Sequence, residues 1–186
     1  AVTNGGTFKT APTSNTELAT PEKIGSKFLG WYTDADCTEG NEFSGTPVLG
    51  QIYYAKWSET EANFVAGGYC GEDLTWKLYK NNTDDTNPTY KLVIEGTGEM
   101  YDYAVSGSNI APWRLDPKQM CNNITEISLP EGITSIGNNA FLKAGISALT
   151  IPNGVTSIGE NAIWNCVDPT DGNVSNVDIT LPSSLK

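Results

Sequence analysis

No histidine occurs in this chain of 186 residues. A Ser-His-Asp triad, a Cys-His pair and any zinc site with a histidine ligand are therefore excluded. Basic residues are also few: 11 lysines and arginines stand against 22 aspartates and glutamates, which gives a net charge of −11. Because that charge repels phosphate backbones and anionic membrane surfaces, we expect no nucleic acid as a partner.

Long apolar runs are absent as well. No stretch approaches the roughly 20 residues of a membrane-spanning helix, and the first residues lack the basic start and apolar centre of a signal peptide. We therefore expect no membrane insertion by this piece. A repeated motif has only begun its third copy at residues 179–185, and we expect the piece to belong to a longer protein.

The four cysteines, Cys37, Cys70, Cys121 and Cys166, show no Cys-x-x-Cys spacing. This gives no support to a metal site or a thioredoxin-type site. Three disulfide pairings are open in an oxidising environment, and buried thiols acting as small apolar side chains are the alternative. Because Cys37 lies in a different predicted domain from the other three, we expect it to form no disulfide.

One ten-residue motif occurs twice: GITSIGNNAF at 132–141 returns as GVTSIGENAI at 154–163. A repeat of about 22 residues is typical of a solenoid, whose units bury their apolar faces only by stacking. Each copy is preceded by an apolar–polar–apolar triplet that ends at proline. The triplets occupy residues 127–129, 149–151 and 179–181. This alternation predicts strands whose outward residues, Ser128, Thr150 and Thr180, form a ladder on one sheet face.

The middle of each copy predicts further inward positions. Ile133 and Ile136 in the first copy correspond to Val155 and Ile158 in the second. The sequences NNAF and ENAI then predict a short helical turn that presents alanine and an apolar residue to the core. A longer step to the third copy places an insert at 167–176, where solenoids carry surface loops.

The repeated unit L-x-I-P-x-G-V-x-S-I-G-x-x-A-F resembles the leucine-rich repeats of BspA-like bacterial surface proteins. Upstream, CGEDLTWKL, YKLVIEGTGEMYDY and APW resemble the capping segment that precedes such repeats. The resemblance covers 69–186, with a cap over about 69–123 and repeats over about 124–186. It departs at Ile163, where the pattern has phenylalanine. The two alternating runs within the cap predict a hairpin with a long polar loop.

The first 57 residues resemble a different module, the Listeria-Bacteroides repeat of internalin-type surface proteins. The motifs that carry this resemblance are GSKFLGWY at 25–32 and YAKW at 54–57. We expect a small β-grasp-like module over 1–57, with a core made mostly of aromatic side chains, followed by a linker over 58–68. The fold class is therefore mainly β with short helical turns, a small module followed by a capped solenoid.

Two acidic stretches are candidate calcium sites. DADCTEG at 34–40 has calcium-loop spacing for two ligands, but Glu39 stands where such a loop needs glycine. A solvated loop is therefore the preferred interpretation. Residues 168–178 gather aspartates and asparagines without a recognised spacing. We predict no metal site and no cofactor, and calcium at 168–178 remains an alternative.

Glu95, Glu99 and Asp102 lie close together in sequence and near several aromatic residues. A glycosidase needs two carboxylates facing each other across a cleft, and nothing in the sequence places these three in one. The alternative is a hairpin with its polar residues facing water. We therefore predict no catalytic residue.

Trp164 of the second copy follows Ile163 and aligns with Leu142 of the first copy. An exposed tryptophan is a typical binding anchor, and covering the long insert is the alternative. The two resemblances imply a non-enzymatic, extracellular part of a bacterial cell-surface protein. They imply adhesion or protein recognition, with Ser128, Thr150, Thr180 and Trp164 as candidate ligand-binding residues.

The implied partners are surface proteins of host or neighbouring cells, or matrix, with the chain itself a monomer. Two other functions remain open. One is a carbohydrate-binding or carbohydrate-active module, which would show a row of exposed aromatics beside paired carboxylates. The other is a purely structural stalk, which would show featureless, well-solvated faces.

Overall fold

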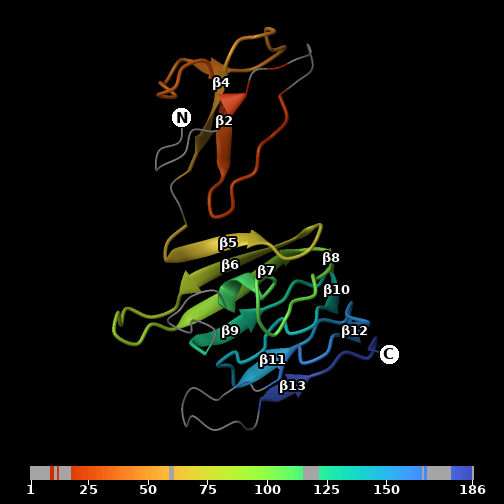
Figure 1. The fold of residues 1–186 in the computed structure, drawn as a ribbon. Coiled ribbons are helices and arrows are strands. Elements are labelled where there is room, and N and C mark those ends of the chain that lie inside the picture. Colours follow the sequence, from red (N-terminus) through yellow and green to blue (C-terminus); the bar gives the residue numbers. More distant parts are fainter. Residues whose placement is uncertain are drawn as a thin grey trace. The chain divides into compact units, whose positions relative to one another are not determined.

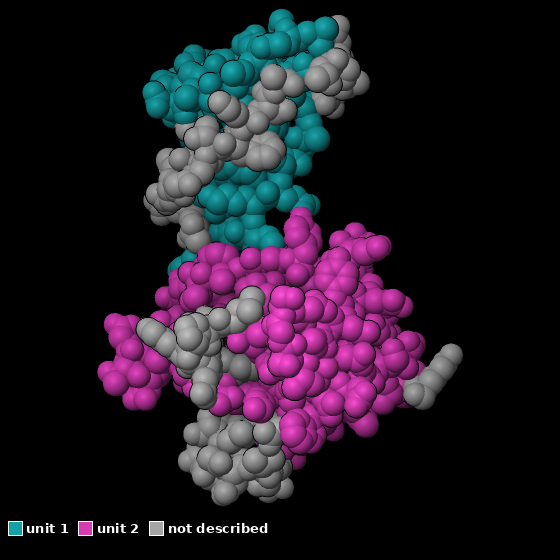
Figure 2. Space-filling model, in the orientation of Figure 1, with its two compact units in different colours: residues 1–62 teal, residues 63–186 magenta. Residues whose placement is uncertain are grey.

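The structure is a computed structural model. It describes residues 9–10, 12, 18–58, 61–114, 122–164, 166 and 177–185. Within these residues the fold is β throughout, apart from one short 3-10 helix, η1, at Pro112–Arg114. The chain divides into two compact units, residues 1–62 and residues 63–186 (Figure 2).

The first unit is one antiparallel sheet with the strand order β1-β4-β2-β3. Its strands are β1 (Lys9–Thr10), β2 (Phe28–Tyr32), β3 (Glu42–Phe43) and β4 (Tyr53–Trp57). We find no helix among the described residues of this unit. The described part of the module is therefore an antiparallel sheet. The β-grasp-like fold of the whole module stays a prediction, because residues 11 and 13–17 lie outside the described residues.

Aromatic side chains make the core of this first unit, as predicted. Along β4 the side chains of Tyr53, Ala55 and Trp57 are buried and alternate with partly exposed ones. Phe28 lies edge-on to Trp31 and Trp57, with ring centroids 5.6 and 5.7 Å apart. Such edge-to-face pairs add to the free energy of area burial, so a few side chains carry most of the stability.

The second unit begins with a four-stranded sheet of order β5-β6-β7-β9 (Figure 1). Its strands are β5 (Phe64–Tyr69), β6 (Leu74–Lys80), β7 (Tyr90–Gly96) and β9 (Ile124–Ser128). The predicted hairpin is β6 and β7, which pair in unbroken antiparallel register. Residues 64–68, predicted as linker, belong instead to β5. They pair along β6, which their small residues allow.

Two parallel sheets hold the repeated copies. The first contains β8 (Gly98–Glu99), β10 (Ile133–Ile136) and β12 (Ser157–Ile158), in the order β12-β10-β8. The second contains β11 (Ala148–Thr150) and β13 (Asp178–Thr180). Ser135 pairs with Ser157 and Ile136 with Ile158, so the first two copies meet at the offset of the sequence repeat.

The copies also meet at the turns that follow β10 and β12. The amide of Phe141 donates to the carbonyl of Ala162 at 2.7 Å, and the side-chain oxygen of Asn138 accepts from the amide of Glu160 at 2.6 Å. Asn139 and Asn161 both have a φ of 54°, in the left-handed region. The helical turns predicted at NNAF and ENAI are therefore hydrogen-bonded turns, because a left-handed residue interrupts any helix.

Trp113 joins the segment before the repeats to the first copy. Its ring centroid lies 5.7 Å from that of Trp76, 5.5 Å from that of Tyr103 and 6.1 Å from that of Phe141. The indole N–H donates to the carbonyl of Ala140 at 2.9 Å. The inward isoleucines Ile133 and Ile136, predicted from the repeat, belong to the same buried cluster.

Candidate functional site

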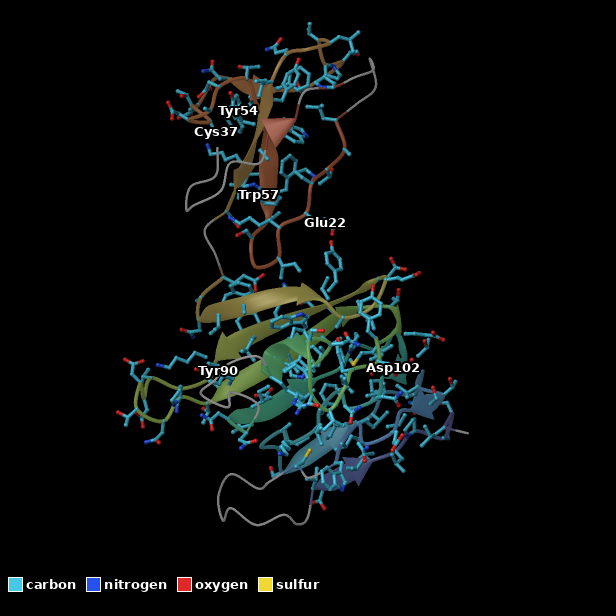
Figure 3. All side chains as sticks on the ribbon, viewed as in Figure 1. Glu22, Cys37, Tyr54, Trp57, Tyr90 and Asp102 are labelled. Atoms are coloured by element: carbon cyan, nitrogen blue, oxygen red, sulfur yellow. The ribbon has the colours of Figure 1, made fainter. Side chains whose placement is uncertain are left out.

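A groove of about 660 Å³ lies along β8, β10 and β12 in the second unit. Four carboxylates line it, those of Glu72, Asp73, Glu99 and Asp102, and none of the described residues in the lining is a lysine or an arginine. Figure 3 shows Asp102 close to β10. Since like charges gathered in one concave surface focus a negative potential, the groove attracts cationic groups.

A row of polar side chains crosses the floor of this groove. Ser135 of β10 pairs with Glu99 of β8 on one side and with Ser157 of β12 on the other. Paired residues on adjacent strands point to the same face, so the three side chains form a ladder. Both copies carry the motif Thr-Ser-Ile-Gly, and its serines are the ladder residues of β10 and β12. From this motif we predicted only the inward isoleucines and not the serine ladder.

Hydrogen bonds hold the groove wall in place. The backbone amide of Asn138 donates to the Asp102 carboxylate at 2.8 Å, which ties the segment after β8 to the first turn of the repeats. The amide of Tyr101 donates to the carbonyl of Cys70 at 2.7 Å. Tyr101 is 46% exposed and is the one aromatic residue among the described residues that line the groove.

The three carboxylates considered for catalysis do not form one group. Glu95 lies on β7 and pairs with Lys77 of β6 at 3.0 Å, outside the groove lining. Glu99 and Asp102 do line the groove, and Asp102 accepts the backbone bond just described. Asp102 therefore has a structural partner already, and Glu95 lies apart from the other two carboxylates.

The predicted ladder of Ser128, Thr150 and Thr180 is only partly present. All three side chains are exposed, as the alternation predicts, and Thr150 pairs directly with Thr180. Ser128, however, lies on β9, which pairs with β7 and belongs to a different sheet. The expectation of one continuous sheet face was wrong, because backbone pairing breaks between the first two copies.

Trp164 is 59% exposed, whereas Leu142 at the same position of the first copy is 1% exposed. Its carbonyl accepts from the amide of Lys143 at 3.0 Å, so the backbone is held while the ring faces solvent. The insert at 167–176 lies outside the described residues. Whether Trp164 serves as an anchor stays a prediction.

The first calcium candidate is an acidic loop closed on itself. The Asp34 carboxylate accepts hydrogen bonds from Asp36, Thr38 and Asn41. Desolvation raises the pKa of Asp34, but these bonds outweigh it and leave the pKa below its ordinary value. Across the described residues, no group of three or more cysteine, aspartate or glutamate side chains is placed to hold a metal ion. Most of the second candidate, 168–178, lies outside those residues.

The described cysteines, Cys37, Cys70 and Cys166, are buried thiols. Burial raises the pKa of Cys70 to about 12 and that of Cys166 to about 11. Since the thiolate is the reactive form, neither thiol is suited to nucleophilic chemistry. Cys121 lies outside the described residues.

Comparison with protein families yields two matches. Residues 119–185 match the family described as BspA type leucine rich repeat region (6 copies), and residues 2–56 match the Listeria-Bacteroides repeat domain. Both resemblances are thereby confirmed. BspA-type repeats and Listeria-Bacteroides repeats are typical of bacterial surface proteins, and neither description names an enzyme.

Among solved structures, the chain is similar to a leucine-rich repeat protein from Eubacterium ventriosum ATCC 27560, whose crystal structure was determined at 2.50 Å. The identity is 28%, over 55% of this chain and 24% of that protein, with a TM-score of 0.39. The chain thus spans about a quarter of that protein's length. A search of curated proteins found no match. Within the part of the chain that the structure describes, no helix has the length and apolar character of a membrane span.

Proposed function

We propose that this chain is a non-enzymatic part of a bacterial cell-surface protein that binds other proteins through the acidic groove of its BspA-type repeats. The single observation that carries the proposal is the groove itself, whose described lining contains four carboxylates and no basic residue. Proteins recognise one another through complementary potentials, which speed encounter and exclude wrong partners. The expected partner is a host, neighbouring-cell or matrix protein with a basic surface.

The repeats form a capped solenoid in this proposal. Support comes from the in-register pairing of Ser135 with Ser157 and from the hydrogen bonds between successive turns. The residues before the repeats serve as the cap, since β7 pairs with β9 and Trp113 packs on Phe141. The Listeria-Bacteroides module, residues 1–57, acts as a separate spacer domain.

Binding of the complete chain to an array of host matrix proteins and glycans tests this function. We expect binding to basic proteins that weakens as salt rises, because the attracting charges are exposed to solvent. Glu99→Lys should lower the association rate most, since it replaces one of the four groove carboxylates with a cation and so weakens the attracting potential. Glu39→Lys, an equal charge change on an exposed loop of the first unit, is the control.

Equal binding by both charge variants would contradict the proposal. Preferential binding of neutral glycans would instead favour a carbohydrate-binding module, for which the exposed ring of Tyr101 is the relevant feature. No binding to either class, with both units folded, would favour a structural stalk.

A further inference from the structure

The first two copies of the repeat are joined along two of their three segments and separated along the third. They are hydrogen-bonded between β10 and β12 and again at the following turns. Between β9 and β11, both fully described, no backbone hydrogen bond is found. β9 is the last strand of its sheet and β11 the first of another, so two strand edges flank a gap.

This gap is a cavity of about 310 Å³, which we name the seam. Its lining includes Ile127, Ser128 and Leu129 from the first copy, and Ala148, Leu149 and Thr150 from the second. A register shift in the pairing of β7 with β9, between Tyr90 and Lys91, gives one physical reason for the gap. Bulged strands bend and twist, which turns β9 away from its neighbour.

The hydrogen bonds of β11 show which backbone groups face the seam. The carbonyl of Ser147 accepts from Asp178, and the amide of Ile151 donates to Thr180. Successive residues of a strand direct their N–H and C=O groups to opposite sides. Since residues 147, 149 and 151 face β13, the backbone groups of Ala148 and Thr150 face the seam.

The side chains around the seam suit an extended polypeptide. Leu149 is 2% exposed and forms an apolar floor, while Ile127 and Leu129 are only partly buried there. The hydroxyls of Ser128 and Thr150 are exposed at its rims. Glu131, also part of the lining, is exposed and has no ion-pair partner among the described residues.

We propose that the seam accepts an extended segment of a partner protein as an inserted β-strand, with alternating apolar and basic side chains. Only a polypeptide backbone satisfies two facing strand edges at once, and main-chain bonds supply affinity in such strand addition. The unpaired carboxylate of Glu131 selects a cationic residue. A second copy of this chain fits less well, because its net charge of −11 repels its own kind.

A capped hexapeptide of alternating valine and lysine, titrated into the full chain, tests the proposal. On binding, the rates at which the amides of Ala148 and Thr150 exchange with solvent should fall at least about tenfold, as measured by NMR hydrogen exchange. Two further peptides carry N-methyl groups, one on the odd and one on the even residues. Because an inserted strand uses both of its edges, each methylated series should bind at least about tenfold more weakly.

Substitutions separate the seam from electrostatic attraction in general. Glu131→Lys should weaken hexapeptide binding about threefold or more, whereas the same charge change at Glu39 should not. Glu99→Lys, in the acidic groove, should leave the slowed exchange at Ala148 and Thr150 unchanged, so failure of the proposed function and failure of the seam proposal are distinguishable. Absence of binding at millimolar peptide, unchanged affinity after methylation of either series, or unchanged exchange at Ala148 and Thr150 each overturns the proposal. Dimerisation of the chain through the seam would also overturn it.

Discussion

The two units of this chain are both β, yet they are stabilised in different ways. In the first unit, the buried cluster among the described residues is Trp31, Tyr53, Ala55 and Trp57. In the second, a much larger cluster combines the aromatic side chains around Trp113 with aliphatic side chains from each of the three sheets of that unit. In the first unit the stabilisation from burial therefore comes from a few large rings, whereas in the second it is shared among many smaller contacts.

The backbone pairing differs in the same sense. Antiparallel strands form the whole described sheet of the first unit, whereas the repeated copies of the second pair in parallel at the offset of the repeat. Each copy depends on its neighbour for burial, as repeat units do. From this comparison we expect single large-to-small substitutions to lower the stability of the first unit most. The stability of the second unit should fall most when contacts between copies are disturbed.

Trp57→Ala should have the largest effect. Truncating a buried tryptophan costs about 3–5 kcal/mol, a large part of the stability of a module of this size. We expect the first unit to unfold while the second keeps its thermal transition, because we propose that the two units unfold independently. Differential scanning calorimetry with NMR of each unit measures this.

Trp57→Phe is the matched control for that substitution. It keeps a ring against Phe28, and the indole N–H that it removes is buried without a hydrogen-bond partner among the described residues. Its cost should therefore be much smaller. A single transition for the whole chain, lowered equally by both substitutions, would show that the units are coupled.

Glycine substitutions in the repeats should rank next. A Cβ added at Gly137 would lie 1.9 Å from the carbonyl oxygen of Tyr101, one at Gly159 2.4 Å from the amide of Asn138, and one at Gly154 2.9 Å from the carbonyl of Ile133. Overpacking costs about 1–3 kcal/mol. Alanine at these positions should destabilise the second unit in that order, measured by urea unfolding. Equal effects at all three would show that the copies are loosely packed.

Asn138→Ala should cost less. The side-chain oxygen of Asn138 accepts the Glu160 amide at 2.6 Å, a bond between the two copies. A bond of this kind contributes about 0.5–1.5 kcal/mol. We expect a loss of that size in the second unit, by urea unfolding, and almost none for Asn153→Ala on an exposed turn. A larger loss for Asn153→Ala would contradict the assignment of this contact.

The smallest expected effect is a pH dependence confined to the first unit. The pKa of Asp34 lies below its ordinary value of 3.8, so its contribution is present above that pH and is lost as the pH falls through the lowered pKa. Asp34→Asn should flatten the stability of the first unit as the pH falls below 3.8. Asp36→Asn is the control, and an identical acid response in both variants would contradict the loop assignment.

Much of the second unit could be predicted, because its apolar residues recur at regular intervals in the sequence. Alternation predicted the exposure of Ser128, Thr150 and Thr180, and the runs around Trp76 and Leu92 predicted the β6–β7 hairpin. Residues 64–68 were predicted as linker because glycines and small residues are typical of flexible segments. In the structure a Cβ at Gly68 would lie 2.9 Å from the indole nitrogen of Trp76, so this glycine admits a packed ring.

The candidate site was only partly predictable. Glu99 and Asp102 were considered for their nearness in sequence, but Ser135 and Ser157 join them only through the pairing of β8, β10 and β12. Glu95, closer to Glu99 in sequence than either serine, points to a different face and pairs with Lys77. Nearness along a chain does not decide which strand face a side chain shares.

The sequence by itself determined the repeat, its 22-residue offset, the inward and outward faces of the first two triplets and the acidic charge, because these follow from covalent order and from the period of a strand. The third triplet departs from the predicted pattern, since Ile179 is 40% exposed and Leu181 is 57% exposed. Only the tertiary structure decided which strand edges meet. β9 pairs with β7 and β11 pairs with β13, which leaves the seam between two copies whose sequences are closely similar. The reason is that backbone hydrogen bonds form wherever packing brings two edges within reach, and packing depends on side chains distant in sequence.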